Sequence, residues 1–152
     1  MFLEQTPFFY KFILLTTILS QLSMKLAEKV NLDDFTPVQF NILQYIALFQ
    51  PVTLSQICEC QHMSMPNASR ELKKLSQKQW INKSKDLTDG RKHLIELSPE
   101  GQVLMNTIFQ HMQNKFEDKL IGADIDQLTQ VEEAFDRILA STILPPITSQ
   151  RT

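Results

Sequence analysis

The stretch that decides the fold runs from Met63 to Gly101 and reads MSMPNASRELKKLSQKQWINKSKDLTDGRKHLIELSPEG. Its first part predicts a helix over about residues 64–78, because Ser64 is a favourable N-cap and Pro66 suits the first helical turn. The apolar residues of this helix recur at helical spacing and form a predicted buried stripe: Ala68, Leu72 and Leu75. The opposite side carries polar and cationic side chains, at Asn67, Arg70, Lys74 and Lys78. A helix with an apolar back and such a front can lie in a DNA major groove.

A β-hairpin is predicted after this helix. Residues 81–85 and 93–97 have strand-like composition, and Asp89-Gly90 between them is a strong tight-turn dipeptide. Arg91 and Lys92 lie beside the turn, so we expect the hairpin to carry a basic tip. A helix followed by a hairpin in this order is the layout of a winged helix-turn-helix.

Positive charge is concentrated in the same stretch. The whole chain has a formal net charge of −2, but residues 64–93 hold eight cations and three anions, so this segment is +5 and the remainder is −7. A basic segment in an acidic chain is typical of a local contact with DNA. A charged stretch on its own more often forms a solvated helix face, and it is the neighbouring hairpin that favours the DNA interpretation.

The hairpin resembles the wing of the MarR family of transcription regulators. The family carries Asp-x-Arg and, a few residues later, Leu-Thr-x-x-Gly, and this chain has Asp89-Gly-Arg91 followed by Leu97-Ser98-Pro-Glu-Gly101. The resemblance extends over nearly the whole chain in the order and length of its elements. Family members usually have glycine where the recognition helix ends, and this chain has Gln79. A left-handed conformation at Gln79 would cost about 1–2 kcal/mol.

The helix face and the resemblance together define the expected sites. We expect the DNA-binding residues to be Ser64, Asn67, Ser69, Arg70, Lys73, Lys74, Asp89, Arg91 and Lys92. The resemblance implies that Arg91 enters the minor groove and that Asp89 orients it. It also implies a homodimer and a pocket for a small aromatic or hydrophobic effector, formed by Phe8, Phe12, Phe40, Phe109 and Met112.

Periodicity divides the chain into four parts. Residues 1–33 are predicted to form an N-terminal dimerisation helix, which opens at Thr6-Pro7, continues to about Val30 and is apolar on more than one face. The other parts are the winged helix-turn-helix domain at 34–98 (recognition helix at about 64–78, wing at about 81–97), C-terminal dimerisation helices at 99–144 and a tail at 145–152. The expected fold is mainly α with a small β-hairpin wing, a winged helix-turn-helix in an intertwined helical homodimer whose topology comes from the resemblance.

Local signals also predict where several helices start and end. Three capping boxes are expected, at Thr36–Gln39, Thr53–Gln56 and Asp124–Gln127. Ser98-Pro99 is expected to start a long helix that ends at about Leu120, with Gly122 as its left-handed cap.

The remaining reactive side chains predict neither a metal site nor an active site. Cys58 and Cys60 cannot pair on one helix because their side chains diverge, so Cys58 is expected in the core and Cys60 is the only plausible redox sensor. The histidines lack metal-ligand spacing, at His62, His93 and His111. No cofactor and no enzymatic activity are expected, because the chain has neither a glycine-rich phosphate loop nor a recognisable catalytic constellation.

The longest uninterrupted apolar run of the first helix, Phe12 to Leu15, is far shorter than the ~20 residues that span a bilayer, which predicts a cytoplasmic protein.

These observations predict a sequence-specific, double-stranded DNA-binding transcription regulator. We expect a ligand- or stress-responsive repressor that binds pseudo-palindromic operators as a dimer. The alternative is a winged-helix module that binds another protein and has no specific DNA binding. The cations Arg70, Lys74 and Arg91 favour the first interpretation, because a protein-binding wing does not need all three to face outward together.

Overall fold

A computed structural model of the protein describes residues 7–28 and 36–141. Several expectations therefore lie outside the described residues: the N-cap at Thr6, the continuation of the first helix to Val30, the segment before Thr36 and the tail at 145–152. Within the described part, the chain is mainly helical with one small antiparallel sheet, as the sequence predicts.

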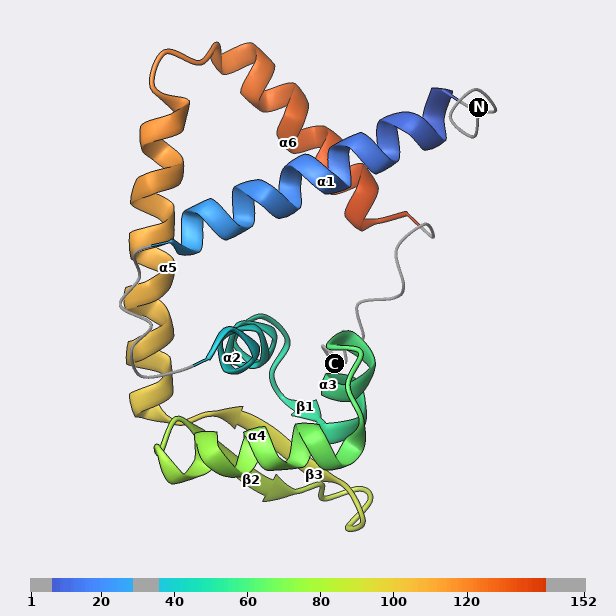
Figure 1. The fold of residues 1–152 in the computed structure, drawn as a ribbon, viewed down its shortest axis with the longest axis vertical. Helices are drawn as coiled ribbons and strands as arrows, with labels where there is room; N and C mark the ends of the chain where they lie inside the picture. The colour runs from blue at the N-terminus through green and yellow to red at the C-terminus, as the bar shows by residue number, and fades with distance from the viewer. Residues whose placement is uncertain (1–6, 29–35, 142–152) are drawn as a thin grey trace.

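The elements follow one another in an order typical of a winged helix (Figure 1). Their bounds are α1 Pro7–Ala27, α2 Pro37–Phe49, β1 Val52–Thr53, α3 Leu54–Cys60, α4 Met65–Gln77, β2 Ile81–Lys85, β3 His93–Leu97, α5 Pro99–Leu120 and α6 Ile125–Leu139. The predicted recognition helix is α4, and the predicted wing strands are β2 and β3.

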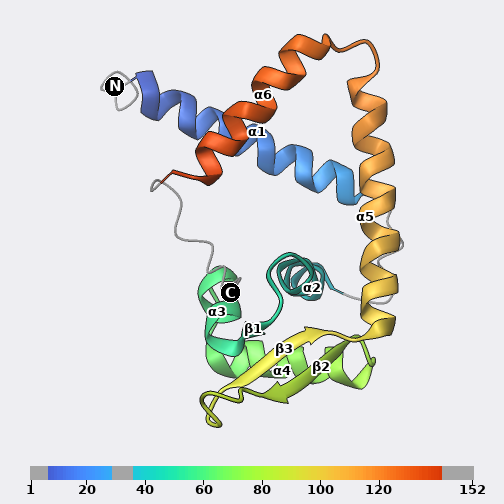
Figure 2. The ribbon, with the colours of Figure 1, turned by 180° about the vertical axis from the view of Figure 1, so that it is seen from behind.

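The subunit has two ends, which the long helix α5 connects (Figures 1 and 2). We call α2, α3, α4 and the sheet the winged-helix end. The helical end consists of α1, α6 and the C-terminal part of α5. At this end Lys115 of α5 donates hydrogen bonds to the backbone carbonyl oxygens of Lys25, at 3.4 Å, and of Glu28. Because the C-terminus of a helix carries a partial negative charge, the Lys115 ammonium stabilises the contact between α1 and α5.

The sheet has three strands in the order β1–β3–β2, and both pairs are antiparallel. Val52 pairs with Ile95 in the short bridge to β1, and Ile81 pairs with Leu97 at the base of the wing. Only the base of β2 is buried, at Ile81, so the rest of that strand projects into solvent. The wing is therefore a solvent-exposed arm held at its base by the core.

The hydrophobic core lies at the winged-helix end. Its fully buried members come from every element there and from the first half of α5, at Ile42, Leu43, Ile46, Val52, Ile57, Leu72, Leu75, Ile95 and Met105. Neither α1 nor α6 contributes a buried residue. This core is built by one chain, whereas the apolar surface of the helical end is not covered within the subunit.

Most of the predicted helix starts are present. Thr36 and Gln39 form the expected capping box, Thr53 and Gln56 form the second, and Ser98 caps α5. The expected third box was wrong. Asp124 is the N-cap of α6, but its carboxylate accepts from the backbone N–H of Asp126 and so uses the second helical position in place of the third.

Two helices of the winged-helix end finish in left-handed non-glycine residues. His62 follows α3 with φ of 49°, and Gln79 follows α4 with φ of 58°. After α4, the Gln79 N–H donates to the Ser76 carbonyl at 3.0 Å and the Trp80 N–H donates to the Leu75 carbonyl at 3.1 Å. This is the Schellman pattern, which normally has glycine at the left-handed position. Gln79 departs from the family in residue type and keeps the backbone geometry of a glycine cap.

Candidate DNA-binding surface

Helix α4 presents a polar face away from the core. Its apolar face is sealed, because Ala68, Leu72 and Leu75 are each at most 1% exposed. The Ser64 hydroxyl accepts a hydrogen bond from the Asn67 N–H at 3.4 Å and so starts the helix. The side chains expected to contact DNA from this helix are all exposed: Asn67, Ser69, Arg70, Lys73 and Lys74. The structure therefore places five of the predicted contact residues on one exposed helix.

Lys78 behaves differently from the other cations of the predicted outer face. Its ammonium lies 4.8 Å from the centre of the Trp80 ring, within the range of a cation–π interaction. Lys78 is thus engaged with the residue that follows the helix. The helical wheel correctly places Lys78 on the exposed face of α4. It could not predict the contact with Trp80, because Trp80 lies beyond the end of the helix.

The wing tip is built from short hydrogen-bonded turns. Residues 86–92 connect β2 to β3. The Asp86 carboxylate accepts from the Thr88 N–H and hydroxyl at 2.8 and 2.7 Å, and the Lys92 N–H donates to the Asp89 carbonyl at 2.9 Å. The expected tight turn at Asp89-Gly90 is thus part of a longer loop, and Gly90 does not have a positive φ.

Asp89 shapes the backbone that carries Arg91. One carboxylate oxygen of Asp89 accepts from the Arg91 backbone N–H at 3.1 Å. The Arg91 and Lys92 side chains are exposed at the tip. Asp89 therefore contacts the main chain of Arg91, and its orienting role in DNA binding stays a prediction.

The second half of the wing motif joins the recognition helix to α5. The Ser98 N–H donates to the Trp80 carbonyl at 3.0 Å, and the Ser98 hydroxyl donates to the Gln79 carbonyl. The same hydroxyl oxygen accepts from the Gly101 N–H at 2.9 Å. A Cβ atom on Gly101 would lie 1.9 Å from the Trp80 carbonyl oxygen, so only glycine fits there. We call these four residues (Gln79, Trp80, Ser98 and Gly101) the α4–α5 joint.

Gln50 strengthens the region next to this joint. Its side-chain oxygen accepts from the Leu97 N–H at 2.8 Å, and its amide nitrogen lies 3.4 Å from the Gln102 side-chain oxygen. Neither contact of Gln50 was predicted from the sequence. A glutamine that follows a helix gives no local signal of partners about fifty residues away.

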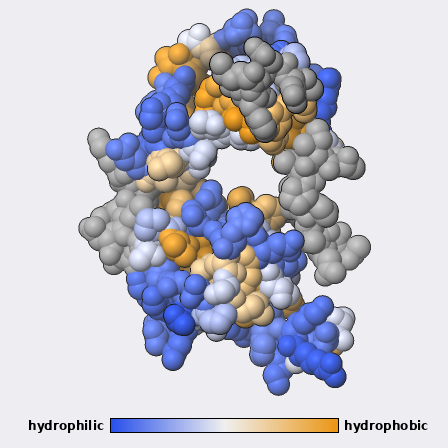
Figure 3. Space-filling model, turned by 45° about the vertical axis from the view of Figure 1, so that its right-hand side comes forward, coloured by the Kyte–Doolittle hydropathy of each residue, from blue (hydrophilic) through white to orange (hydrophobic). Residues whose placement is uncertain are grey.

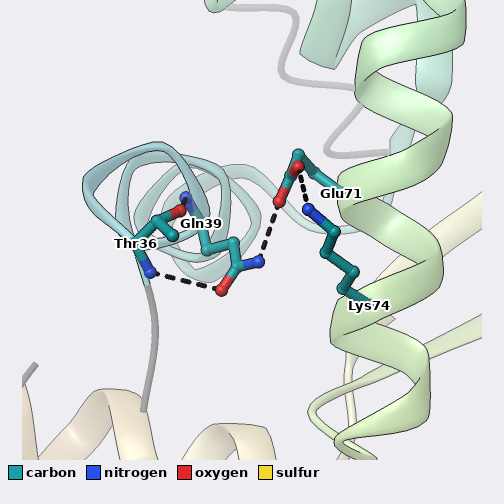
Figure 4. Close-up of polar contacts among 4 residues, drawn as sticks. All are labelled: Thr36, Gln39, Glu71 and Lys74. Carbon is teal, nitrogen blue, oxygen red and sulfur yellow. Dashed lines mark hydrogen bonds and ion pairs between the residues drawn. The ribbon is translucent and has the colours of Figure 1, made fainter. Parts of the chain in front are cut away.

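A polar network links α4 to the start of α2 (Figure 4). The Gln39 amide nitrogen donates to one carboxylate oxygen of Glu71 at 2.8 Å, and the Lys74 ammonium lies 2.7 Å from the other. The hydrogen bonds from Lys74 and Gln39 lower the pKa of Glu71. Lys74 was predicted as a DNA contact, and its link to Glu71 and Gln39 was not predicted from the sequence.

The three anions of the basic segment are all engaged in local bonds. Glu71 is bonded to Gln39 and Lys74, Asp86 to Thr88, and Asp89 to the Arg91 backbone. Hydrogen bonds from the Thr88 hydroxyl and backbone N–H lower the pKa of Asp86 below its ordinary value. The carboxylates are thus held in turns and pairs, while Arg70, Lys73 and Arg91 project from the surface.

The fold agrees with the comparisons with known proteins. The sequence model of the MarR family matches residues 33–92, which span α2 to the wing tip. Over this part the chain is similar to the MarR family, and its fold is that of a winged helix. None of the curated proteins matches the sequence.

Solved structures of MarR-family regulators share the fold. A MepR mutant from a multidrug-resistant S. aureus clinical isolate has a TM-score of 0.68 at 20% identity, over 89% of this chain and 96% of that one. Transcriptional regulator Tm0710 from Thermotoga maritima has a TM-score of 0.65 at 15% identity, over 82% and 88%. A mutant MarR from E. coli has a TM-score of 0.65 at 19% identity, over 83% and 93%. The resemblance first seen in the wing thus holds for the fold of nearly the whole chain.

The effector residues expected from the MarR resemblance are divided between two places. Phe40 is buried, and Phe109 and Met112 pack against the same core cluster. Phe8 and Phe12 lie near the N-terminal end of α1, where they are 68% and 38% exposed. Within one subunit the five side chains do not line one pocket. A pocket that uses all five requires a second chain and stays a prediction.

Both cysteines of the chain lie on α3. Cys58 packs against the core, and its sulfur lies 3.4 Å from the Met65 sulfur. Cys60 is exposed, and partial burial of its thiol raises the pKa, an effect that Glu59 reinforces. A raised pKa leaves little of the reactive thiolate at neutral pH.

Two further features concern the described residues as a set. Among residues 7–28 and 36–141, no three His, Cys, Asp or Glu side chains come together as metal ligands would. In the same two ranges, every helix is too short or too polar to cross a membrane.

Proposed function

We propose that this protein is a transcription regulator that binds specific sites on double-stranded DNA as a homodimer. In this proposal it is a cytoplasmic repressor, and a small aromatic or hydrophobic ligand lowers its affinity for DNA. Helix α4 enters the major groove, and Arg91 at the wing tip enters the neighbouring minor groove.

One observation carries the proposal: α4 and the wing tip, the two elements that carry the exposed cations, lie at the same end of the chain (Figures 1 and 2). Arg70 and Lys73 are exposed on the helix, and Arg91 and Lys92 are exposed at the tip. Arginine recognises guanine with two hydrogen bonds, and lysine more often contacts phosphate. A helix flanked by a basic arm therefore suits base contacts in one groove and backbone contacts beside it.

The helical end supports the dimer. Large apolar side chains are exposed on both of its helices, on α1 at Phe9, Ile13, Leu15, Ile18 and Leu19 and on α6 at Val131, Phe135, Ile138 and Leu139. Figure 3 shows hydrophobic side chains gathered at this end, whereas the opposite tip is hydrophilic. Since large apolar patches on monomers are unusual, a second copy of the chain is the natural cover.

Similar proteins support both proposed ligands. S. aureus MepR is described as a transcription regulator of the multidrug efflux pump MepA. Other solved structures hold MepR with an oligodeoxyribonucleotide or with ethidium bromide. We infer by analogy that this chain binds duplex DNA and an aromatic effector.

Selection of bound sites from random duplex DNA tests the proposal. We expect inverted repeats whose half-site centres are about one helical turn apart. If two subunits together neutralise roughly 6–8 phosphates, the logarithm of affinity should fall with the logarithm of salt at a slope of about −5 to −7. Absence of binding at low salt would refute the proposal and leave the protein-binding alternative.

A ligand titration tests the regulatory part. Ethidium bromide should bind the free dimer and weaken its complex with the selected DNA. Because ethidium also binds DNA, its binding to the protein must first be measured without DNA. A protein that binds its site tightly and does not bind ethidium would retain the DNA proposal and lose this effector class.

A further inference from the structure

The side-chain amide of Gln39 is held at both ends. Gln39 is 4% exposed. Its oxygen accepts from the Thr36 N–H at 3.3 Å as part of the capping box, and its nitrogen donates to Glu71 at 2.8 Å. Turning the amide over would break both hydrogen bonds, so its orientation is fixed. Gln39 is therefore a rigid donor that points from α2 toward the recognition helix (Figure 4).

Glu71 is in turn occupied on both carboxylate oxygens. One accepts from Gln39, and the other lies 2.7 Å from the Lys74 ammonium. The Glu71 side chain is 19% exposed, whereas that of Lys74 is 55% exposed. The carboxylate thus lies between a buried amide and an ammonium at the edge of the exposed face of α4.

An ordinary surface ion pair does not account for this arrangement. Exposed pairs three residues apart on a helix contribute little to stability and hold neither side chain in place. Here a buried side chain from another helix fixes the carboxylate. A negative charge on a helix that approaches DNA also repels phosphates, so Glu71 opposes binding unless it positions a group that assists it.

We propose that Glu71 is a positioning residue for DNA recognition, which holds the Lys74 ammonium at one place because Gln39 fixes the carboxylate. The inference rests on the proposed DNA-binding function. A held ammonium reaches one phosphate and fixes the register of α4 on the duplex, whereas a free lysine reaches several. Glu71 therefore raises discrimination between DNA sites and lowers sequence-independent affinity.

Three variants separate the roles of charge and position. Glu71→Gln leaves one acceptor oxygen where the wild type has two, so the new amide nitrogen faces either the Gln39 amide nitrogen or the Lys74 ammonium and Lys74 is no longer held. Gln39→Glu preserves a capping box, because glutamate serves at this position as well as glutamine. It replaces the amide donor with a carboxylate, which cannot donate to Glu71. The double variant Gln39→Glu with Glu71→Gln exchanges donor and acceptor and keeps the wild-type net charge.

The matched control is Glu59→Gln. Glu59 is an exposed carboxylate on α3, next to the recognition helix and outside the network. Its substitution changes the net charge as Glu71→Gln does. A purely electrostatic effect on DNA affinity appears in both variants. An effect of the position of Lys74 appears only in Glu71→Gln.

The main readout is discrimination, measured as the ratio of the dissociation constants for scrambled and selected duplexes at one salt concentration. We expect Glu71→Gln to tighten binding to scrambled DNA and to lower the ratio by about tenfold, the effect of one contact of moderate strength. Gln39→Glu should lower the ratio similarly. The double variant should restore it to within about threefold of wild type. Melting temperatures identify any variant that fails to fold.

Two outcomes overturn the inference. The first is a wild-type ratio in Glu71→Gln at unchanged melting temperature. The second is an equal fall in the ratio in Glu59→Gln, which would show that charge alone matters. If Gln39→Glu unfolds, Glu71→Gln and its control still decide. A wild-type protein that binds no DNA refutes the proposed function itself, a result distinct from both.

Discussion

One residue, Gln79 at the end of α4, has a backbone conformation that lowers the stability of the fold. Gln79 has the backbone conformation of a glycine cap, with φ of 58°. A residue with a Cβ atom is disfavoured in this left-handed region by about 1–2 kcal/mol, and glycine avoids this cost. Glycine also has more conformational freedom in the unfolded chain, which offsets part of the gain in stability.

The first prediction is that Gln79→Gly stabilises the protein. We expect the free energy of unfolding to rise by about 0.5–1 kcal/mol, the difference between the two effects. Gln79→Ala is the control, because it shortens the side chain and keeps the strain. Denaturant unfolding at fixed protein concentration measures both. A loss of stability in Gln79→Gly would show that the glutamine side chain is needed.

The second prediction concerns Gly101 in the α4–α5 joint. A glycine within a helix normally gains stability when alanine replaces it. Here the new Cβ would lie 1.9 Å from the Trp80 carbonyl oxygen, so the first turn of α5 and the backbone at Trp80 must move apart. We expect Gly101→Ala to destabilise the protein by about 1–3 kcal/mol, as overpacking does.

Gly90→Ala is the matched control for Gly101→Ala. Nothing lies within 4 Å of a Cβ at Gly90, and its φ is not positive. We expect a change within about 0.5 kcal/mol, typical of surface substitutions. Equal losses in the two variants would mean that the close approach to Trp80 does not determine the outcome.

The third prediction is a pH dependence from Glu71. Hydrogen bonds from Lys74 and Gln39 hold the pKa of folded Glu71 below its ordinary value of 4.5. A lowered pKa in the folded state means that ionised Glu71 stabilises the fold. This contribution is complete above about pH 5.5 and is lost as the pH falls through the folded-state pKa.

The stability difference between wild type and Glu71→Gln should therefore shrink in acid. Unfolding curves between about pH 3 and pH 7 measure it. Glu59→Gln should show a smaller change over the same range, because Glu59 lies outside the network. A difference that grows on acidification would contradict the direction of the shift.

At the scale of the element, the wing is an arm whose tip makes no core contact. Arg91 and Lys92 are exposed beyond the strands, and only the base of β2 is buried. The fourth prediction is that Arg91→Ala leaves the melting temperature unchanged and weakens DNA binding by about 1–3 kcal/mol. Lys119→Ala, an exposed cation in the last turn of α5, is the charge-matched control. A fall in melting temperature would make Arg91 structural.

Most elements were predictable because their signals are local. The N-caps Thr36, Thr53 and Ser64 lie within three residues of the groups that they bind, and the strand bounds follow from composition. Asp124 shows the limit of such signals. The capping box predicts a hydrogen bond with the N–H of Gln127, and the carboxylate accepts from the N–H of Asp126 instead.

The contacts that shape the site could not be predicted because they are distant in sequence. Gln39 and Glu71 are 32 residues apart, and Ser98 lies 19 residues from Gln79. Periodicity places each residue on a helix face and does not say which other helix that face meets. The Ser98–Gly101 half of the wing motif was predictable as a family feature. Its role in the joint became visible only when Trp80 was placed against it.

At the scale of the whole molecule, the helical end leaves large apolar side chains exposed. In the described part of α1, and throughout α6, no residue is buried. Fully burying one large apolar side chain is worth about 1.5–3 kcal/mol, so this surface represents a stabilisation comparable to that of a whole domain.

The fifth prediction is that the intact chain sediments as a dimer of two 17.6 kDa subunits at micromolar concentration. Phe135→Glu, at a side chain that is 41% exposed on α6, should dissociate the dimer and weaken binding to full DNA sites. Val103→Glu is the control, since Val103 is 67% exposed in the first half of α5, at the winged-helix end. A well-folded wild-type monomer would show that α1 and α6 need no partner.

The α4–α5 joint makes α5 a lever. Its 22 residues extend for about 33 Å, and a tilt of about 5° about one end displaces the other by about 3 Å. Because Ser98 and Gly101 attach the first turn of α5 to the end of α4, the recognition helix follows that movement with little slack. In the proposed dimer, a small rearrangement among these helices would thereby change the distance between the two recognition helices, which must match the helical repeat of DNA. The proposed geometry of DNA binding would then be set at the helical end, at a distance from α4 and the wing.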